Sequence, residues 1–216
     1  MADVTDTAGF PPGFFDRGDP TSDDVFYAPT RFVTHIDDGA IAAVGELYAE
    51  LGIDGAVLDL CSSWISHFEE RPRELVALGM NAEELAANPQ AASWVRRDLN
   101  VDPTLPFDDD SFDDAVCCVS VDYLVRPIEV FTEVARVLRP GGRFVCTFSN
   151  RCFPSKAIRG WLATDDETHL AIVAEYFRRA DGFDEPVAGT RRAGAPGRDP
   201  LYAVWARVGA PTTAGR

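Results

Sequence analysis

The chain has one lysine and little positive charge of any kind. Among its 216 residues Lys156 is the only lysine, and 20 basic residues stand against 35 acidic ones, a formal net charge of −15. Nucleic-acid binding needs a basic face for the phosphates, so this charge argues against nucleic acid as a partner. An acidic surface poor in lysine also fits adaptation to high salt, where screening weakens the repulsion among carboxylates.

Long apolar runs, a secretory leader and paired cysteines are also missing. No run of 18 apolar residues exists, so no membrane span is expected. The opening MADVTDTAGFPPGFFDRGD carries acids and prolines where a signal peptide would be basic and then apolar, which predicts a cytoplasmic protein. The five cysteines show no C-x-x-C spacing, so we expect buried, reduced thiols and no metal site.

Apolar residues are present at an ordinary 46%, and short apolar runs alternate with helical patterns. This alternation predicts an α/β fold in three Rossmann-like layers, with a mostly parallel seven-stranded sheet that ends in an antiparallel hairpin. The expected strands are 56–60, 74–80, 93–99, 113–121, 143–149, 185–194 and 199–208, and the expected helices are 38–51, 82–89, 127–138 and 166–180.

We divide the chain into an N-terminal arm (1–40), a single domain (41–210) and a disordered tail (211–216). Residues 1–24 are polar and rich in proline and glycine, so we expect them to be mobile or loosely packed. In open α/β sheets, ligands bind at the carboxyl ends of the strands, where the strand order reverses. The functional residues are therefore expected in the segments that follow the strands.

Two stretches carry a family pattern. DLNVDPTLPFDDDSFDDAV (98–116) has an acid after the third strand, an LPF loop and SFD before the fourth strand, and EVARVLRPGGRFVCTFSN (133–150) has a helix that ends in LRPGG before the fifth. This ordered set resembles class I S-adenosylmethionine-dependent methyltransferases of the methyltransferase type 11 kind, over roughly residues 55–150. The resemblance implies the methyltransferase version of the fold, S-adenosylmethionine as cofactor and methyl transfer to a small molecule.

The turn after the first strand departs from the family pattern. Asp59 is the family's acid, which holds the turn and orients the methionine end of the cofactor. The family then has Leu-Gly-x-Gly-x-Gly, whereas here Cys61, Ser63 and Ile65 stand at the glycine places. The cofactor has no phosphate to cradle, and the hydroxyls of Ser62 and Ser63 can serve its amino-acid end.

The ribose position also differs. Asn81 stands where the family has an acid for the two ribose hydroxyls, with Ala82 beside it. Asn81 is equally well placed as a helix N-cap, with Glu84 three residues later as in a capping box, and the two roles need not exclude each other.

The adenine position follows the third strand. The resemblance implies that Asp98 accepts from the adenine amino group and that the N–H of Leu99 meets the ring, with Asn100 or Asp102 in place of Asp98 if the register is shifted. Ser120, after the fourth strand, completes the predicted cofactor set.

The reacting groups are predicted around the next two strand ends. Asp122 and Tyr123 stand where the methyl group emerges, and can bind or deprotonate a nucleophile or simply cap the loop. The N/D/S-P-P-Y/F tetrad of adenine and glutamine methyltransferases is absent there. His35 and His67 are the best general-base candidates by pKa, although a lone histidine is more often structural.

Asn150 is grouped with the catalytic candidates, and the substrate contacts are assigned to Tyr27, Trp64, His67 and Arg151. Asn150, Arg151 and Lys156 form a basic segment that binds an anionic substrate group or neutralises local charge. Trp64 is expected over the cofactor or in the substrate cavity.

Residues 25–37, which include Tyr27 and Phe32, are predicted to close as a lid. The alternative to an enzyme is a cofactor-binding or scaffolding protein without catalysis, motivated by the lost glycines. A dehydrogenase is disfavoured because no G-x-G-x-x-G follows the first strand.

Overall fold

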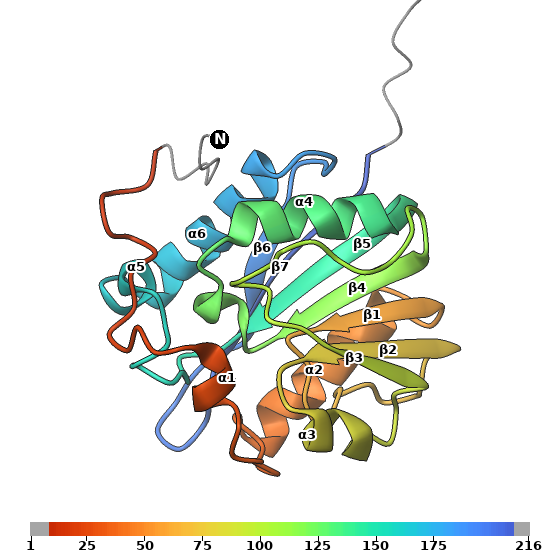
Figure 1. Cartoon of the computed structure of the whole chain (residues 1–216), viewed down its shortest axis with the longest axis horizontal. Coiled ribbons are helices and arrows are strands. Elements are labelled where there is room, and N and C mark those ends of the chain that lie inside the picture. Colours follow the sequence, from red (N-terminus) through yellow and green to blue (C-terminus); the bar gives the residue numbers. More distant parts are fainter. Residues whose placement is uncertain (1–8, 210–216) are drawn as a thin grey trace, which may run out of the picture.

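The computed structural model describes residues 9–209 (Figure 1). The tail predicted at 211–216 and the first eight residues of the arm lie outside the described residues. Within residues 9–209, no helix has the length and apolar character needed to cross a bilayer.

One seven-stranded sheet forms the centre of the molecule, in the order β3-β2-β1-β4-β5-β7-β6. The strands are β1 (Ala56–Leu60), β2 (Glu74–Gly79), β3 (Ser93–Arg96), β4 (Phe112–Cys118), β5 (Leu138–Phe148), β6 (Val187–Arg192) and β7 (Leu201–Arg207). The first five in this order pair in parallel, and β7 pairs antiparallel with both β5 and β6. The predicted α/β fold with its C-terminal antiparallel pair is confirmed, and the strand order reverses between β1 and β4.

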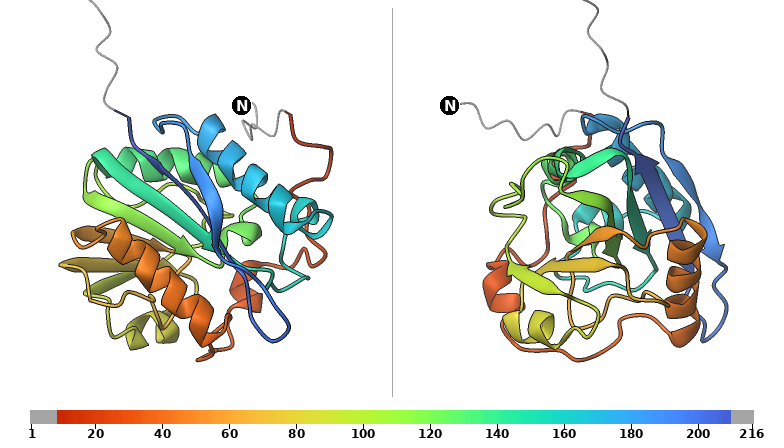
Figure 2. Two further views of the ribbon diagram at one scale, coloured as in Figure 1. Left: turned by 180° about the vertical axis from the view of Figure 1, so that it is seen from behind. Right: turned by 90° about the vertical axis from the view of Figure 1, so that its right-hand side faces the viewer.

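Helices cover both faces of this sheet. They are α1 (Asp23–Phe26), α2 (Asp38–Glu50), α3 (Ala82–Ala87), α4 (Pro127–Val137), α5 (Arg159–Leu162) and α6 (Asp166–Arg179), with a 3₁₀ turn η1 (Val121–Tyr123). Helix α2 lies on one face and α4 on the other, as the front and back views show (Figures 1 and 2). The four predicted helices are found, whereas α1, α5 and η1 are too short to leave a periodic pattern.

The apolar core forms two layers because strand side chains alternate between faces. On β5, Phe144, Cys146 and Phe148 belong to the layer under α4 and α6, whereas Val145 belongs to the layer under α2. In the first layer the ring of Phe131 packs against Phe144 at 4.8 Å between ring centres. The apolar face of α4 is therefore what holds that helix on the sheet.

The connection from β1 to β2, residues 61–73, contains no helix. Phe68 of this connection packs on Tyr48 of α2, with 4.7 Å between ring centres. Parallel strands usually cross over through a helix, so this connection is unusually open. The α2 face of the sheet is consequently covered by α2 and by a loop at this place.

Two expectations are corrected. Strand β5 begins at Leu138, so the RPGG predicted to lie before the strand is inside it, and a register shift follows the pairing of Leu138 with Phe112. The arm is not loosely packed over residues 9–24, because the rings of Phe10, Phe14 and Phe15 pack on one another and on the core under α4 and α6.

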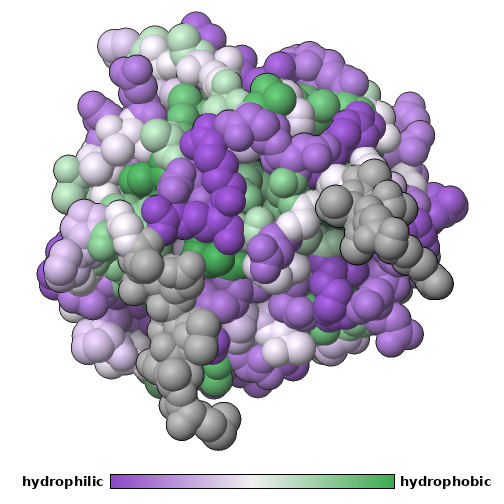
Figure 3. Space-filling model, turned by 90° about the horizontal axis from the view of Figure 1, so that it is seen from above, coloured by the Kyte–Doolittle hydropathy of each residue, from purple (hydrophilic) through white to green (hydrophobic). Residues whose placement is uncertain are grey.

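The surface seen from above is mostly hydrophilic, with small hydrophobic areas between (Figure 3).

Candidate functional site

A cavity of about 420 Å³ lies at the carboxyl ends of the strands, bounded on one side by the arm. It includes the turn after β1, the residues after β2, β3 and β4, and the segment after β5. Most of the predicted site residues line it: Tyr27, His35, Asp59, Cys61, Ser62, Ser63, His67, Asn81, Asp98, Leu99, Ser120, Tyr123, Asn150 and Arg151. Ala82, Trp64 and Asp122 do not line it.

Asp59 is buried at the end of β1, with 4% of its surface exposed. The hydroxyls of Ser62 and Ser66 both donate to its Oδ2, each at 2.6 Å. Burial raises the pKa of Asp59 to about 6, although these two hydrogen bonds lower it. The serines of the turn therefore hold the carboxyl in place at the cavity wall.

The turn keeps the backbone of a glycine turn although its glycines are lost. Cys61, at the first glycine place, has φ of 53°, in the left-handed region that glycine favours. The N–H of Ser62 donates to the carbonyl of Leu78 at 2.8 Å, which brings the turn onto the end of β2. A Cβ on Gly79 would lie 2.1 Å from the carbonyl oxygen of Ser62. The turn thus depends on a glycine in the neighbouring strand.

The side chain of Asn81 is fully used within the protein. Its Oδ1 accepts from the N–H groups of Glu83 and Glu84 at 3.0 and 3.1 Å, as an N-cap does. Its Nδ2 donates to the carbonyls of Tyr27 and Ala28 at 3.0 and 3.2 Å. The predicted role of Asn81 as a helix N-cap is confirmed. Because both N–H groups of the amide are already used within the protein, its side chain has no donor left for a ribose hydroxyl.

Glu84 is the acid that lines the cavity beside Asn81. One oxygen accepts from the N–H of Arg31 at 2.6 Å and the other from the hydroxyl of Ser63 at 2.7 Å. Each carboxylate oxygen can accept a second hydrogen bond, so Glu84 retains capacity toward the cavity. The sequence pattern predicts Glu84 only as part of a capping box, three residues after Asn81. That spacing places Glu84 beside Asn81 but does not by itself indicate a place in the cavity wall. Ala82, predicted here, lies in the first turn of α3 outside the cavity wall.

The loop after β3 agrees with the family pattern. Asp98 accepts from the N–H groups of Asn100 and Val101 at 2.9 and 3.3 Å, both through Oδ1. Burial raises the pKa of Asp98. Leu99 is buried beside it, whereas Asp102 pairs with Arg97 and does not line the cavity. Asp98, and not Asp102, is therefore the acid of this loop that lines the cavity.

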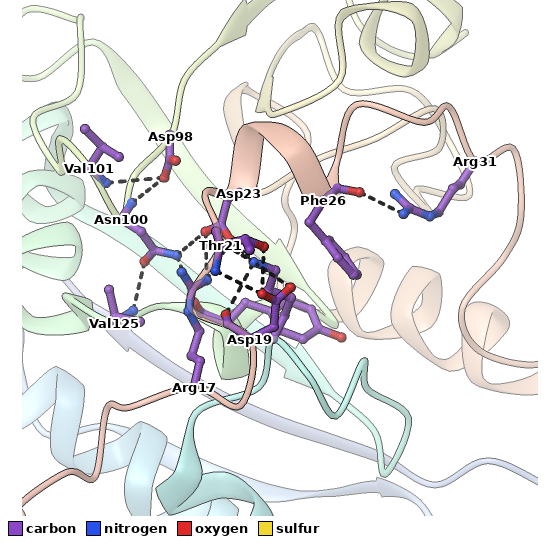
Figure 4. Close-up of polar contacts among 12 residues, drawn as sticks. Arg17, Asp19, Thr21, Asp23, Phe26, Arg31, Asp98, Asn100, Val101 and Val125 are labelled. Carbon is purple, nitrogen blue, oxygen red and sulfur yellow. Dashed lines mark hydrogen bonds and ion pairs between the residues drawn. The ribbon is translucent and has the colours of Figure 1, made fainter.

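Asn100 joins this loop to the arm (Figure 4). Its Nδ2 donates to Asp23 at 2.9 Å and to the carbonyl of Tyr123 at 3.0 Å, and its Oδ1 accepts from the N–H of Val125 at 2.8 Å. This amide is occupied as fully as that of Asn81, so its role is to hold three segments together.

Lys156 anchors the arm and does not face a substrate. It is 0% exposed, donates to the carbonyl of Thr21 at 2.6 Å, and pairs with Asp19 and Asp23 at 3.2 Å each. Asp23 also accepts from Arg17 at 2.8 Å. Of the two roles predicted for this segment, neutralising local charge is the one that Lys156 has, because its ammonium is taken up by the arm. Asp19, Thr21 and Asp23, which surround that ammonium, are labelled in Figure 4.

Trp64 turns away from the cavity toward the arm. Its indole N–H donates to the carbonyl of Val33 at 3.1 Å, and its ring meets Phe32 edge to face at 6.1 Å. The predicted place of Trp64 inside the cavity is therefore not found. The space expected for the cofactor is not filled by this side chain.

Two neutral histidines line the cavity. Burial lowers the pKa of His35, and burial together with the nearby His35 lowers the pKa of His67 to about 4. The Nδ1 of His67 is buried and has no hydrogen-bond partner among the described residues. Both rings are therefore uncharged near pH 7, and each has one ring nitrogen that can accept a hydrogen bond.

The residues after β4 divide between two environments. Tyr123 lines the cavity, and its hydroxyl oxygen accepts from the N–H of Phe153 at 2.8 Å. Asp122 lies behind it, 3% exposed, and burial raises its pKa to about 8. Because Asp122 is protonated at neutral pH and outside the cavity wall, the geometry does not bring it to a substrate as predicted.

Three further predicted residues line the cavity at the ends of β4 and β5. Ser120 donates to the carbonyl of Cys118 at 3.1 Å, which points its hydroxyl back at its own strand. Asn150 is exposed, and Arg151 pairs with Asp199 at 3.5 Å. Arg31 and Tyr48 also line the cavity, and no local sequence pattern distinguished them.

The strand order, the reversed final pair and a cavity with acids after β1 and β3 define the class I methyltransferase fold. Residues 58–146 match the family model described as methyltransferase domain. A solved S-adenosylmethionine-dependent methyltransferase from Thermotoga maritima superposes with a TM-score of 0.56 over 77% of this chain and 89% of its own, at 15% identity. The fold is thus that of the class I S-adenosylmethionine-dependent methyltransferases, and the methyltransferase domain matched by residues 58–146 implies S-adenosylmethionine as cofactor.

Curated relatives match over shorter stretches. The mitochondrial 2-methoxy-6-polyprenyl-1,4-benzoquinol methylase of Danio rerio is 35% identical over 74 residues, which are 34% of this chain and 22% of that protein. The demethylmenaquinone methyltransferase of Clavibacter sepedonicus is 47% identical over 51 residues, 23% of this chain and 21% of that protein. The chain therefore spans about a fifth of the length of the curated relatives it matches.

Proposed function

We propose that this protein transfers the methyl group of S-adenosylmethionine to a small molecule. One observation carries the proposal: a single cavity of about 420 Å³ collects Asp59, Glu84 and Asp98 from three neighbouring strand ends. Three acids in that order suit an ammonium group, a pair of ribose hydroxyls and an adenine amino group, all of which donate hydrogen bonds.

The residues present fit the cofactor, provided that Glu84 takes the ribose position predicted for Asn81. Asp98 directs only Oδ1 to its own loop, and no hydrogen bond to its Oδ2 is found within residues 9–209. Asp59 and the serine turn suit the methionine end. Because the amide of Asn81 is occupied, Glu84 takes the ribose position in this proposal, with Ser63 as its fixed neighbour.

When bound, the cofactor supplies a sulfonium methyl that is open to in-line displacement. The protein's part is to orient the acceptor and exclude water. The arm excludes water, since its contacts to Asn81 and Glu84 close one side of the cavity. His35 and His67 are uncharged, and an unprotonated ring nitrogen of each can accept a hydrogen bond from the methyl acceptor, with Tyr27, Asn150 and Arg151 as further candidates for substrate contact.

Calorimetry with S-adenosylhomocysteine tests the proposal. We expect wild type to bind and Asp98→Ala to bind about 10- to 100-fold more weakly, because a hydrogen bond to a charged group contributes about 1.5–3 kcal/mol. Asp102→Ala is the matched control, since it removes an acid from the same loop outside the cavity. Absence of binding by wild type, or equal loss in both variants, contradicts the proposal.

Turnover separates the enzyme from its alternative. A cofactor-binding or scaffolding protein would bind S-adenosylhomocysteine yet release none from S-adenosylmethionine with any acceptor. Formation of S-adenosylhomocysteine that depends on an added acceptor, measured on the full chain, supports the enzyme.

We further propose that the protein is cytoplasmic and adapted to high salt. The adaptation to salt is supported by the charge of −15 with one lysine. The melting temperature is expected to rise between low and molar salt as screening reduces repulsion among carboxylates. A melting temperature that stays level or falls contradicts adaptation to salt.

A further inference from the structure

The cavity extends below the proposed cofactor positions to the face of the sheet that α2 covers. Tyr48 of α2 and His67 of the helix-free connection both line it. Tyr48 is 2% exposed, so the cavity reaches a side chain that otherwise belongs to the core under α2. This lower part of the cavity, lined by Tyr48, His67 and Cys118 beside Asp59, is called the floor.

Strand alternation gives the floor a polar lining. Val57 of β1 and Val145 of β5 belong to the core under α2, so Asp59 and Thr147, two residues further along each strand, face the same side. Cys118 packs on this core as well and is the register partner of Thr147. Polar side chains thus gather where the apolar layer under α2 meets the cavity.

Polar atoms at the floor are buried with few or no partners. Within the described part of the chain, Nδ1 of His67 makes no hydrogen bond, and the hydroxyls of Tyr48 and Thr147 lie against each other without a further partner on the cavity side. A buried polar group without a partner costs about 1–3 kcal/mol, so such groups in a cavity wall call for a bound polar group. Tyr48 and His67 reach the cavity itself, and Thr147 neighbours the Tyr48 hydroxyl behind it.

The floor carries no positive charge. Burial raises the pKa of Tyr48 well above its usual range and that of Cys118 to about 12, and His67 is neutral. The arginines that line the cavity, Arg31, Arg97 and Arg151, come from the arm and the loops after β3 and β5. An anion would therefore meet no cation there, and its nearest charged group would be Asp59.

We propose that the floor is a subsite for a neutral hydroxyl group of the methyl acceptor. A hydroxyl is both donor and acceptor, so it donates to Nδ1 of His67 and accepts from the Tyr48 hydroxyl. A carbonyl would leave His67 unpaired in its acceptor form, and a methyl ether could not donate at all. The inference rests on the proposed function and names its substrate class, a hydroxylated small molecule.

Phenol is the probe, with methoxybenzene, benzoate and benzylamine as matched compounds of similar size. Their binding to the full chain is measured by ligand-detected NMR titration, with and without S-adenosylhomocysteine. We expect phenol to bind more tightly than the other three. Tyr48→Phe should weaken phenol binding about fivefold, as loss of one hydrogen bond of about 1 kcal/mol predicts.

Tyr176→Phe is the control for removing a buried phenol group. Tyr176 is 0% exposed and its hydroxyl also lacks a partner among the described residues, but it packs on the α6 side outside the cavity. Tyr48→Phe should be close to wild type in stability, because the hydroxyl has only its contact with Thr147 to lose, and a clear loss of stability would indicate a structural hydroxyl instead.

The outcomes separate this inference from the proposed function. Equal binding of phenol and methoxybenzene, no binding of phenol, tighter binding of benzoate or benzylamine, or equal effects of both tyrosine variants overturns the subsite. Selective phenol binding without binding of S-adenosylhomocysteine keeps the subsite and removes the methyltransferase proposal.

Discussion

The two ends of the cavity reach a similar outcome from different sequences. After β3, Asp98 follows the family pattern and is held by the backbone of its own loop. After β1, the family glycines are gone, and Asp59 is held by two serine hydroxyls instead. The comparison teaches that a missing motif need not mean a missing geometry, since the left-handed turn at Cys61 remains.

The difference lies in where each end gets its support. The carboxylate of Asp98 is held by N–H groups of its own loop, whereas the turn after β1 relies on the neighbouring strand through Gly79. Variants of Gly79 should therefore lower stability and cofactor binding together. Asp98→Ala removes the acceptor of two backbone N–H groups, so its loss of binding should come with a smaller loss of stability.

The largest effect is expected for Gly79→Ala. The new Cβ would lie 2.1 Å from the carbonyl oxygen of Ser62, so the turn must move. We expect a loss of about 3 kcal/mol in the free energy of unfolding, typical of overpacking at its upper range, and weaker binding of S-adenosylhomocysteine. Chemical denaturation and calorimetry measure the two effects.

Gly189→Ala on β6 is the control, because a Cβ at that position would have no atom within 4 Å apart from those of its two chain neighbours. It should be neutral or slightly stabilising. If Gly79→Ala behaves like Gly189→Ala, the turn does not depend on the neighbouring strand.

The free energy of unfolding should depend on pH through Asp59, the acid of the turn after β1. Its pKa of about 6 lies above the value of 3.8 for a free carboxyl, so the folded state holds the proton to higher pH than the unfolded state. Stability therefore falls as pH rises from about 4 to about 6, by about 3 kcal/mol from this group.

Asp59→Asn removes that contribution while it keeps an oxygen for the two serines. Unfolding free energies at pH 4 and pH 6 should differ less in the variant than in wild type. Identical slopes for both proteins would show that the Asp59 carboxyl does not titrate in this window.

The smallest effect concerns the backbone at Cys61. A left-handed conformation costs a residue with a Cβ about 1 kcal/mol, so Cys61→Gly should be more stable than Cys61→Ala by about that amount. At Ser63, which is absent from the positive-φ residues, the usual order with alanine above glycine is expected. Denaturant unfolding of the glycine and alanine variants at positions 61 and 63 measures their stabilities. The same order of stability at both positions would contradict a strained backbone at Cys61.

The sequence was sufficient for the sheet, for its main helices and for most cavity residues. Their signals are local: the apolar run at 56–60, the amphipathic pattern of α4 and the acid after β3. Asn81 was recognised as a cap because a cap and its helix are adjacent in the chain.

What the sequence could not provide depends on partners far along the chain. Asn81 is saturated by carbonyls of the arm, and Trp64 is turned outward by Val33. Phe10 and Phe14 fix an arm whose composition is that of a loose segment. None of these contacts has a local pattern, so each could be seen only in three dimensions.

The burial of Lys156 gives the protein a built-in chemical reporter. It is the chain's only lysine, and its ammonium is enclosed by Asp19, Thr21 and Asp23 of the arm. Reagents that acylate lysine side chains can reach it only when the arm detaches or the protein unfolds. The rate at which one acyl group appears on Lys156 by mass spectrometry would therefore time the opening of the cavity directly, without any engineered label.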